Sequence, residues 1–156
     1  MTSKVAPLAA ALACILVGPA ISQVGSADSS ATFIFKKSYD RGLGVGTSTR
    51  QLYYHLPNGD CRGRRKQAAF SWITGEQKQR ILPAGRSLTL WMFTQHFRPG
   101  WEYVCQNAAA FTPRPGATYE VALRSTVGSH CEVSVVESST GQVPADIKFD
   151  SSLTCR

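Results

Sequence analysis

The amino-acid sequence predicts an all-β protein, an antiparallel β-sandwich of about seven to nine strands that follows an N-terminal signal peptide. Short segments with apolar residues at every second position recur along the chain, and this period of two is typical of strands that bury one face. Turn residues, mainly Gly, Pro and Asn, separate the segments. No stretch keeps helical periodicity over three turns. The 156 residues therefore predict a leader at 1–27 and a single β-sandwich domain at 28–156.

The leader has the pattern of a secretory signal peptide. A short polar start with Lys4 precedes an apolar run at 5–21, and small polar residues follow at 23–30. Prolines and a glycine interrupt the run, which makes it a poor membrane span. Small residues fit cleavage after either Ser22 or Ala27. We therefore expect export to the periplasm or the extracellular space.

Cys14 offers an alternative to soluble export. The segment Ala-Leu-Ala-Cys at 11–14 is similar to the bacterial lipobox, in which the cysteine becomes lipidated. The leucine stands one place too late, however, and the apolar run continues at 15–17. Soluble export is favoured, and contact with the outer membrane through a lipid anchor is expected only if Cys14 is lipidated.

The strands are predicted from alternation bounded by turn residues, and they lie at 31–39, 51–56, 68–73, 79–82, 87–94, 101–105, in a hairpin within 111–136, and at 145–150. The hairpin is the clearest of these, with Gly128 at its turn. Glycines at 42, 44 and 46 predict a loop and no phosphate site, because a strand follows them where a dinucleotide-binding fingerprint needs a helix.

The apolar positions of the alternating segments define the expected core: Phe33, Phe35, Leu88, Leu90, Tyr119, Val121, Leu123, Val133, Val135, Ile147 and Phe149. In the strand at 87–94, alternation places Trp91 and Phe93 on the face opposite Leu88 and Leu90. That aromatic face must meet either a ligand or a covering segment. A neighbouring loop is the simpler cover.

Four cysteines remain after the leader, and in an exported chain they predict two disulfides. Their spacing contains no close Cys-x-x-Cys pair, so neither a metal site nor a thioredoxin-like redox site is expected. We expect Cys61–Cys105 and Cys131–Cys155, because the last strand is expected to return beside residues 131–136. The alternative, Cys61–Cys155 with Cys105–Cys131, needs residues 101–105 and 131–136 to face each other across the sandwich.

The chain is basic, and its densest charge lies beside Cys61. Of the 17 basic and 10 acidic side chains only Lys4 lies in the leader, so the mature domain carries 16 basic side chains and a net charge of +6. Four cations surround Gly63 in a predicted loop: Arg62, Arg64, Arg65 and Lys66. They form either an anion-binding patch or a solvated turn. The solvated turn is favoured, because no aromatic residues interleave the run.

One part of the chain resembles a known group of proteins. The segment Leu-Pro-Ala-Gly at 82–85 before a strand, and the later spacing Phe111-x-Pro113-x-x-Gly116-x-x-Tyr119-x-Val121, are similar to a pattern in small bacterial envelope domains with a transthyretin-like or immunoglobulin-like sandwich. The resemblance covers about residues 80–136, and its motifs are turn and strand residues. It implies the fold and an envelope location and carries over no active site.

The side chains that could carry chemistry are scattered. His55, His96 and His130 fall on separate predicted elements without metal-ligand spacing, and we expect them to be solvated or at sheet edges. No cofactor is expected. The sequence favours an exported non-catalytic binding or structural module whose partner is an anionic envelope polymer or another envelope protein. The alternative is a small secreted basic hydrolase such as a nuclease, which would join a glutamate to a histidine and an arginine.

Overall fold

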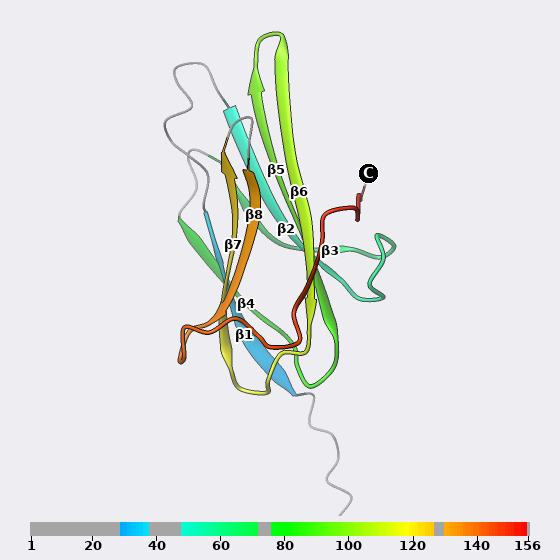
Figure 1. Cartoon of the computed structure of the whole chain (residues 1–156), viewed down its shortest axis with the longest axis vertical. Coiled ribbons are helices and arrows are strands. Elements are labelled where there is room, and N and C mark those ends of the chain that lie inside the picture. The colour runs from blue at the N-terminus through cyan, green and yellow to red at the C-terminus, as the bar shows by residue number, and fades with distance from the viewer. Residues whose placement is uncertain (1–28, 38–47, 72–75, 127–129, 156) are drawn as a thin grey trace, which may run out of the picture.

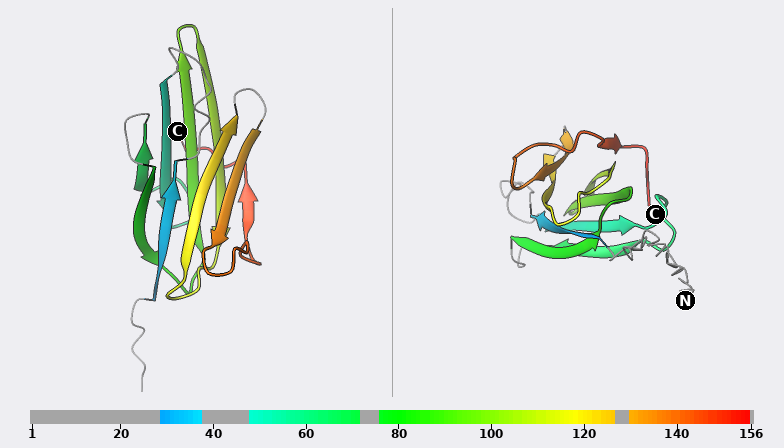
Figure 2. Two further views of the ribbon diagram at one scale, coloured as in Figure 1. Left: turned by 90° about the vertical axis from the view of Figure 1, so that its left-hand side faces the viewer. Right: turned by 90° about the horizontal axis from the view of Figure 1, so that it is seen from below.

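The computed structural model describes residues 29–37, 48–71, 76–126 and 130–155, and this part of the chain contains strands and no helix. The nine strands are β1 Ser30–Lys36, β2 Ser48–Leu56, β3 Arg65–Phe70, β4 Gln77–Pro83, β5 Leu88–Arg98, β6 Trp101–Phe111, β7 Thr118–Thr126, β8 His130–Glu137 and β9 Lys148–Asp150. They form a four-stranded sheet in the order β4-β1-β7-β8 and a five-stranded sheet in the order β3-β2-β5-β6-β9. The two sheets pack as layers (Figures 1 and 2). The predicted sandwich is confirmed.

The predicted hairpin is the β7–β8 pair, which runs antiparallel from Tyr119 opposite Glu137 to Thr126 opposite His130. Next to it, β1 lies parallel to β7, with Phe33 opposite Tyr119. This parallel pair is the exception among the described strand pairs, since the others are antiparallel. The leader, Cys14 and the glycine-rich loop lie outside the described residues, as does the hairpin turn at 127–129.

The core is aromatic and lies between the sheets. The ring centroids of Phe35 and Tyr53 are 5.1 Å apart, and those of Tyr119 and Phe111 are 5.2 Å apart, so the two sheets meet through ring contacts. Nine of the expected core residues are buried: Phe33, Phe35, Leu88, Leu90, Tyr119, Val121, Leu123, Val133 and Val135. Ile147 is only partly buried, and it packs against this cluster.

The expectation for the last strand is wrong. Residues 145–150 were expected to form a half-buried strand beside β8, but β9 has only three residues, all of them exposed, and it pairs with β6. Phe149, expected in the core, is 50% exposed. The segment after β8 crosses one end of the sandwich and rises along β6 (Figure 1). Alternation at 145–150 therefore did not reflect a strand packed over the core.

The expected disulfide pairing is also wrong, and the alternative is correct. Cys61 is bonded to Cys155 and Cys105 to Cys131, with Cα atoms 5.3 and 5.4 Å apart. The physical reason is the position of β9. Because the chain end follows β6, Cys155 reaches the turn after β2, while Cys105 on β6 meets Cys131 on β8 across the sandwich. Two disulfides are consistent with folding in an oxidising compartment.

The β5–β6 hairpin is longer than expected. The strands were predicted to end at residues 94 and 105, but β5 continues to Arg98 and β6 runs from Trp101 to Phe111. Only Pro99 and Gly100 turn the chain, and Gly100 has a φ of 77°, which favours glycine. The hairpin extends beyond the other strands at one end (Figure 1). Its length creates the wide outer face on which the candidate site lies.

Candidate functional site

A groove of about 700 Å³ lies on the outer face of the five-stranded sheet. The register of β2 and β5 places Arg50 opposite Gln95, Leu52 opposite Phe93 and Tyr54 opposite Trp91. Directly opposed residues share a face of the sheet, so these three pairs form successive rows across the groove. β6 extends two of the rows, with Val104 opposite Gln95 and Gln106 opposite Phe93.

Aromatic rings form one end of the groove and part of its floor. The ring centroids of Tyr54 and Trp91 are 5.4 Å apart, and those of Trp91 and Phe93 are 5.7 Å apart. Trp91 is only 3% exposed, and its Nε1 donates a hydrogen bond of 3.2 Å to the carbonyl oxygen of Leu153. The C-terminal segment therefore covers Trp91, whereas Phe93 stays partly exposed in the groove.

Arg64 is the cation that lies over these rings. Its guanidinium carbon lies 5.6 Å from the centre of the Tyr54 ring and 5.9 Å from that of Trp91, within the range of cation–π attraction. Its Nη1 also donates a hydrogen bond of 3.0 Å to the carbonyl oxygen of Cys155. The Cys61–Cys155 disulfide ties the basic loop to the chain end and so holds Arg64 at the groove.

The other cations of the basic loop do not line the groove. Arg62 lies in the exposed turn, where its backbone N–H donates to the Asp60 carboxylate at 2.9 Å. Arg65 and Lys66 begin β3 and are exposed. Arg64 is thus the member of the predicted patch that lines the groove. Sequence reasoning missed Arg50, an exposed cation at the opposite end of the groove, because one isolated arginine in an alternating strand carries no local signal.

Polar side chains from β5 and β6 line the remaining edge of the groove. Gln95 donates a hydrogen bond through its Nε2 to Oε1 of Glu102, and Gln106 lies opposite Phe93. Val104, which is 43% exposed, lies between Glu102 and Gln106 on β6. The groove thus combines two guanidinium groups, an apolar floor and an edge of amides and one carboxylate. Groups of these kinds are suited to binding and orienting a ligand.

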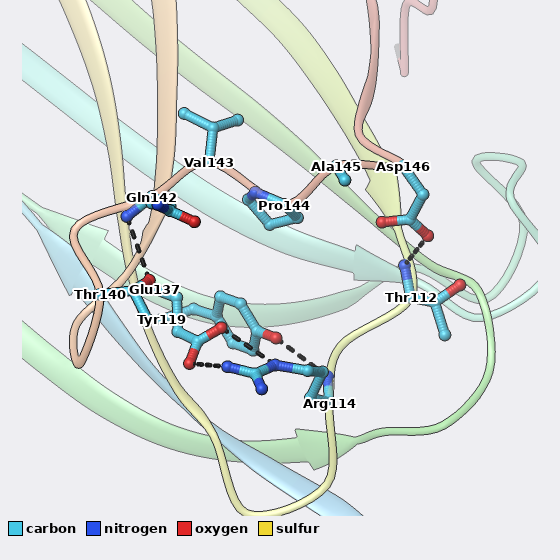
Figure 3. A pocket seen from close by; sticks show the side chains of 10 residues that line it. All are labelled: Thr112, Arg114, Tyr119, Glu137, Thr140, Gln142, Val143, Pro144, Ala145 and Asp146. Carbon is cyan, nitrogen blue, oxygen red and sulfur yellow. Dashed lines mark hydrogen bonds and ion pairs between the residues drawn. The ribbon is translucent and has the colours of Figure 1, made fainter.

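A second pocket, of about 490 Å³, lies at the end of the sandwich crossed by the segment after β8 (Figure 3). Arg114 donates two hydrogen bonds to the Glu137 carboxylate, and its backbone N–H donates to the Tyr119 hydroxyl at 2.9 Å. Asp146 accepts from the Thr112 backbone N–H at 2.8 Å. The charged groups of this pocket are engaged in holding the chain segments together, so it is a weaker candidate for binding a ligand.

The Arg114–Glu137 ion pair also lowers the pKa of Glu137. Hydrogen bonds from Arg114 and then from Ser139 hold the pKa of the Glu137 carboxyl below its usual value. The pair therefore contributes stability above the ordinary carboxyl pKa, and that contribution is lost as the pH falls through the lower folded value.

Among the described side chains, no histidine lines either pocket, and the side chain of His130 lies outside the described part. His96 is fully buried on the inner face of β5, with Nδ1 2.9 Å from the Thr49 hydroxyl and Nε2 2.8 Å from the Ser125 hydroxyl. The expectation of a solvated or edge histidine is wrong here, because inward positions continue along the lengthened β5. His55 is partly buried. Within the described residues, no group of three or more His, Cys, Asp or Glu side chains could hold a metal ion.

We expect stability to fall through His96 as the pH drops below the ordinary histidine pKa of 6.5. Burial lowers the pKa of His96 from the ordinary value of 6.5, so the unfolded chain takes up the proton first. The free energy of unfolding should then fall by at most about 1.4 kcal/mol per pH unit for this histidine. Urea unfolding of His96→Gln should show a flatter pH dependence than the wild type.

His55→Gln is the comparison variant for this measurement. Burial, and then the charges of Arg65 and Arg86, lower the pKa of His55, so it contributes in the same direction from outside the core. If His96→Gln kept the full wild-type slope, the buried ring would not be the source of the pH dependence.

Neither a model of a known protein family nor a curated protein matches the chain. The resemblance to envelope sandwich domains therefore stays a prediction. Within the ranges that the structure describes, no helix is long and apolar enough to cross a membrane.

Proposed function

We propose that this protein is an exported, non-catalytic binding module that holds an anionic ligand in the groove on its five-stranded sheet. One observation carries the proposal: Arg64 and Arg50 lie at the two ends of a groove whose floor includes Phe93. The tertiary structure joins a cation of the basic loop to aromatic rings that are distant in the sequence. Charge and apolar contact in one groove are what recognition of an anionic polymer requires.

Other features support export and an anionic partner. The chain carries a net charge of +7, which attracts anionic partners over a distance of about a Debye length. The two disulfides suit the periplasm or the extracellular space, and the leader pattern suits export. An envelope polymer fits these conditions better than a cytoplasmic ligand. Lipidation of Cys14 would add an anchor in the outer membrane.

The described lining of the groove contains groups that can bind a ligand, and it contains no pair of a histidine and a carboxylate. Glu102 lines it with Arg50 and Arg64, while His96 is sealed between the sheets. The described part of the groove therefore lacks the joined histidine and carboxylate that a small hydrolase would use. This arrangement favours the binding module over the nuclease.

Retention on immobilised heparin tests the proposal. The variant Arg50→Ser/Arg64→Ser should elute at clearly lower salt than the wild type, because exposed cations bind polyanions through screened charge. The matched control is Arg80→Ser/Arg124→Ser, which removes two exposed arginines from the four-stranded sheet. Its elution should shift less. Equal shifts for the two variants would show that overall charge, and not the groove, binds the polymer.

A further inference from the structure

We infer that the ligand of the groove is an acidic polysaccharide, a chain of pyranose sugars that carry carboxylates. This inference rests on the proposed function and names the chemical class that the site would take. Three properties of the groove carry it: the spacing of its cations, the apolar floor between them and the acceptors along its β6 edge.

The first property is the distance between the two cations. Arg50 and Tyr54 lie four residues apart on β2, a span of about 13 Å along an extended strand. The guanidinium of Arg64 lies over Tyr54, so it marks the far end of that span. This span is wider than a compact anion such as a single phosphate. The ligand should therefore be an extended chain with repeated negative charge.

The second property is the floor between the cations. Leu52 and Phe93 are directly opposed, and Val104 adds an exposed apolar side chain beside them. Trp91 is covered by the C-terminal segment and Tyr54 by Arg64, so Phe93 is the ring that a ligand can stack on. A ligand that fits this floor needs an apolar face between its charges. Pyranose rings present such a face of C–H groups, whereas polyphosphate has none.

The third property distinguishes a sugar chain from a nucleic acid. Glu102 is an acceptor, and the amides of Gln95 and Gln106 both donate and accept. Sugar hydroxyls can donate to the Glu102 carboxylate and accept from the amides. A nucleic acid strand stacks successive bases on several rings, whereas Phe93 is the ring left open among the described residues of this groove. A polar edge beside one open ring therefore favours a hydroxyl-rich chain over a strand of stacked bases.

Isothermal titration calorimetry on the disulfide-bonded protein tests the inference with three probes: oligogalacturonate, poly(dT) and inorganic polyphosphate. The wild type should bind oligogalacturonate more tightly than either of the others. Phe93→Ala should weaken oligogalacturonate binding by about tenfold, which is within the loss expected when a ring leaves a stacking platform. Phe93→Leu, which keeps apolar volume without the ring, guards against a mere folding defect and should weaken binding as well.

Phe149→Ala is the matched control, because Phe149 is an exposed aromatic residue of the same sheet that does not line the groove. It should leave oligogalacturonate binding unchanged. Tighter binding of poly(dT) or polyphosphate, with the same dependence on Arg50 and Arg64, would overturn the polysaccharide inference and leave the proposed function standing. If no probe bound and heparin retention did not depend on the groove arginines, both would fail.

Discussion

Replacing Cys61 and Cys155 together by serine is expected to lower the free energy of unfolding by about 2–4 kcal/mol. This disulfide closes a loop with a sequence separation of 94, so its loss frees a long stretch of the unfolded chain. It should also release the C-terminal segment that covers Trp91 and supports Arg64. Urea unfolding measures the first effect, and retention on heparin measures the second.

The double variant Cys105→Ala/Cys131→Ala separates these two effects. Its disulfide joins the sheets with a sequence separation of only 26, and Cys105 lies on the inner face of β6, opposite to the groove. The double variant should destabilise the fold while leaving heparin retention nearly unchanged. Peptide mapping under non-reducing conditions provides an independent check, because a linked fragment that holds Cys61 and Cys105 would contradict the connectivity.

Tyr53→Ala is expected to lower the free energy of unfolding by about 3–5 kcal/mol, the range for truncating a large buried ring. Tyr53 is fully buried, and its ring contacts Phe35 across the sandwich and Phe70 within its own sheet. Its hydroxyl donates to the Lys36 carbonyl oxygen at 2.7 Å and accepts from the Leu123 backbone N–H at 3.0 Å. One side chain of β2 thus hydrogen-bonds to both β1 and β7 and locks the two sheets together.

Tyr53→Phe isolates the hydroxyl and should lower the free energy of unfolding by about 1–3 kcal/mol, because it removes two hydrogen bonds inside the core. Tyr54→Phe is the matched control. This neighbouring residue faces the groove, and the loss of its hydroxyl should change stability by no more than about 0.5 kcal/mol. Equal losses for the two variants in chemical denaturation would refute the role of Tyr53 as the link between the sheets.

Both predictions bear on the groove as well as on the fold. Tyr53 and Tyr54 are consecutive in β2 and point to opposite faces of the sheet, so the strand that locks the core also carries one end of the groove. Cys155 lines that same end. A rigid core and a tethered chain end together keep Arg64 over the aromatic rings before a ligand arrives. Binding therefore loses less conformational entropy at this side chain.

The sequence alone determined the fold class and the inward-facing apolar residues of β1, β7 and β8 and of the first part of β5. Alternation is a local property, because successive side chains of a strand point to opposite faces whatever its neighbours are. It therefore predicted the β7–β8 hairpin and the buried positions Phe33 and Leu90, and it separated Leu90 from the outward-facing Phe93. Local alternation cannot show where a strand ends, and so β5 and β6 proved longer than expected.

Only the tertiary structure decided which distant segments meet. Strand order placed β9 beside β6, and that order selected the disulfides and left Phe149 exposed. Cross-strand register placed Arg50 at one end of the groove, and the Cys61–Cys155 disulfide held Arg64 at the other, although nothing in the sequence links these two arginines. The physical reason is that pairing between strands far apart in the chain depends on the packing of the whole sandwich, whereas alternation depends only on the strand itself.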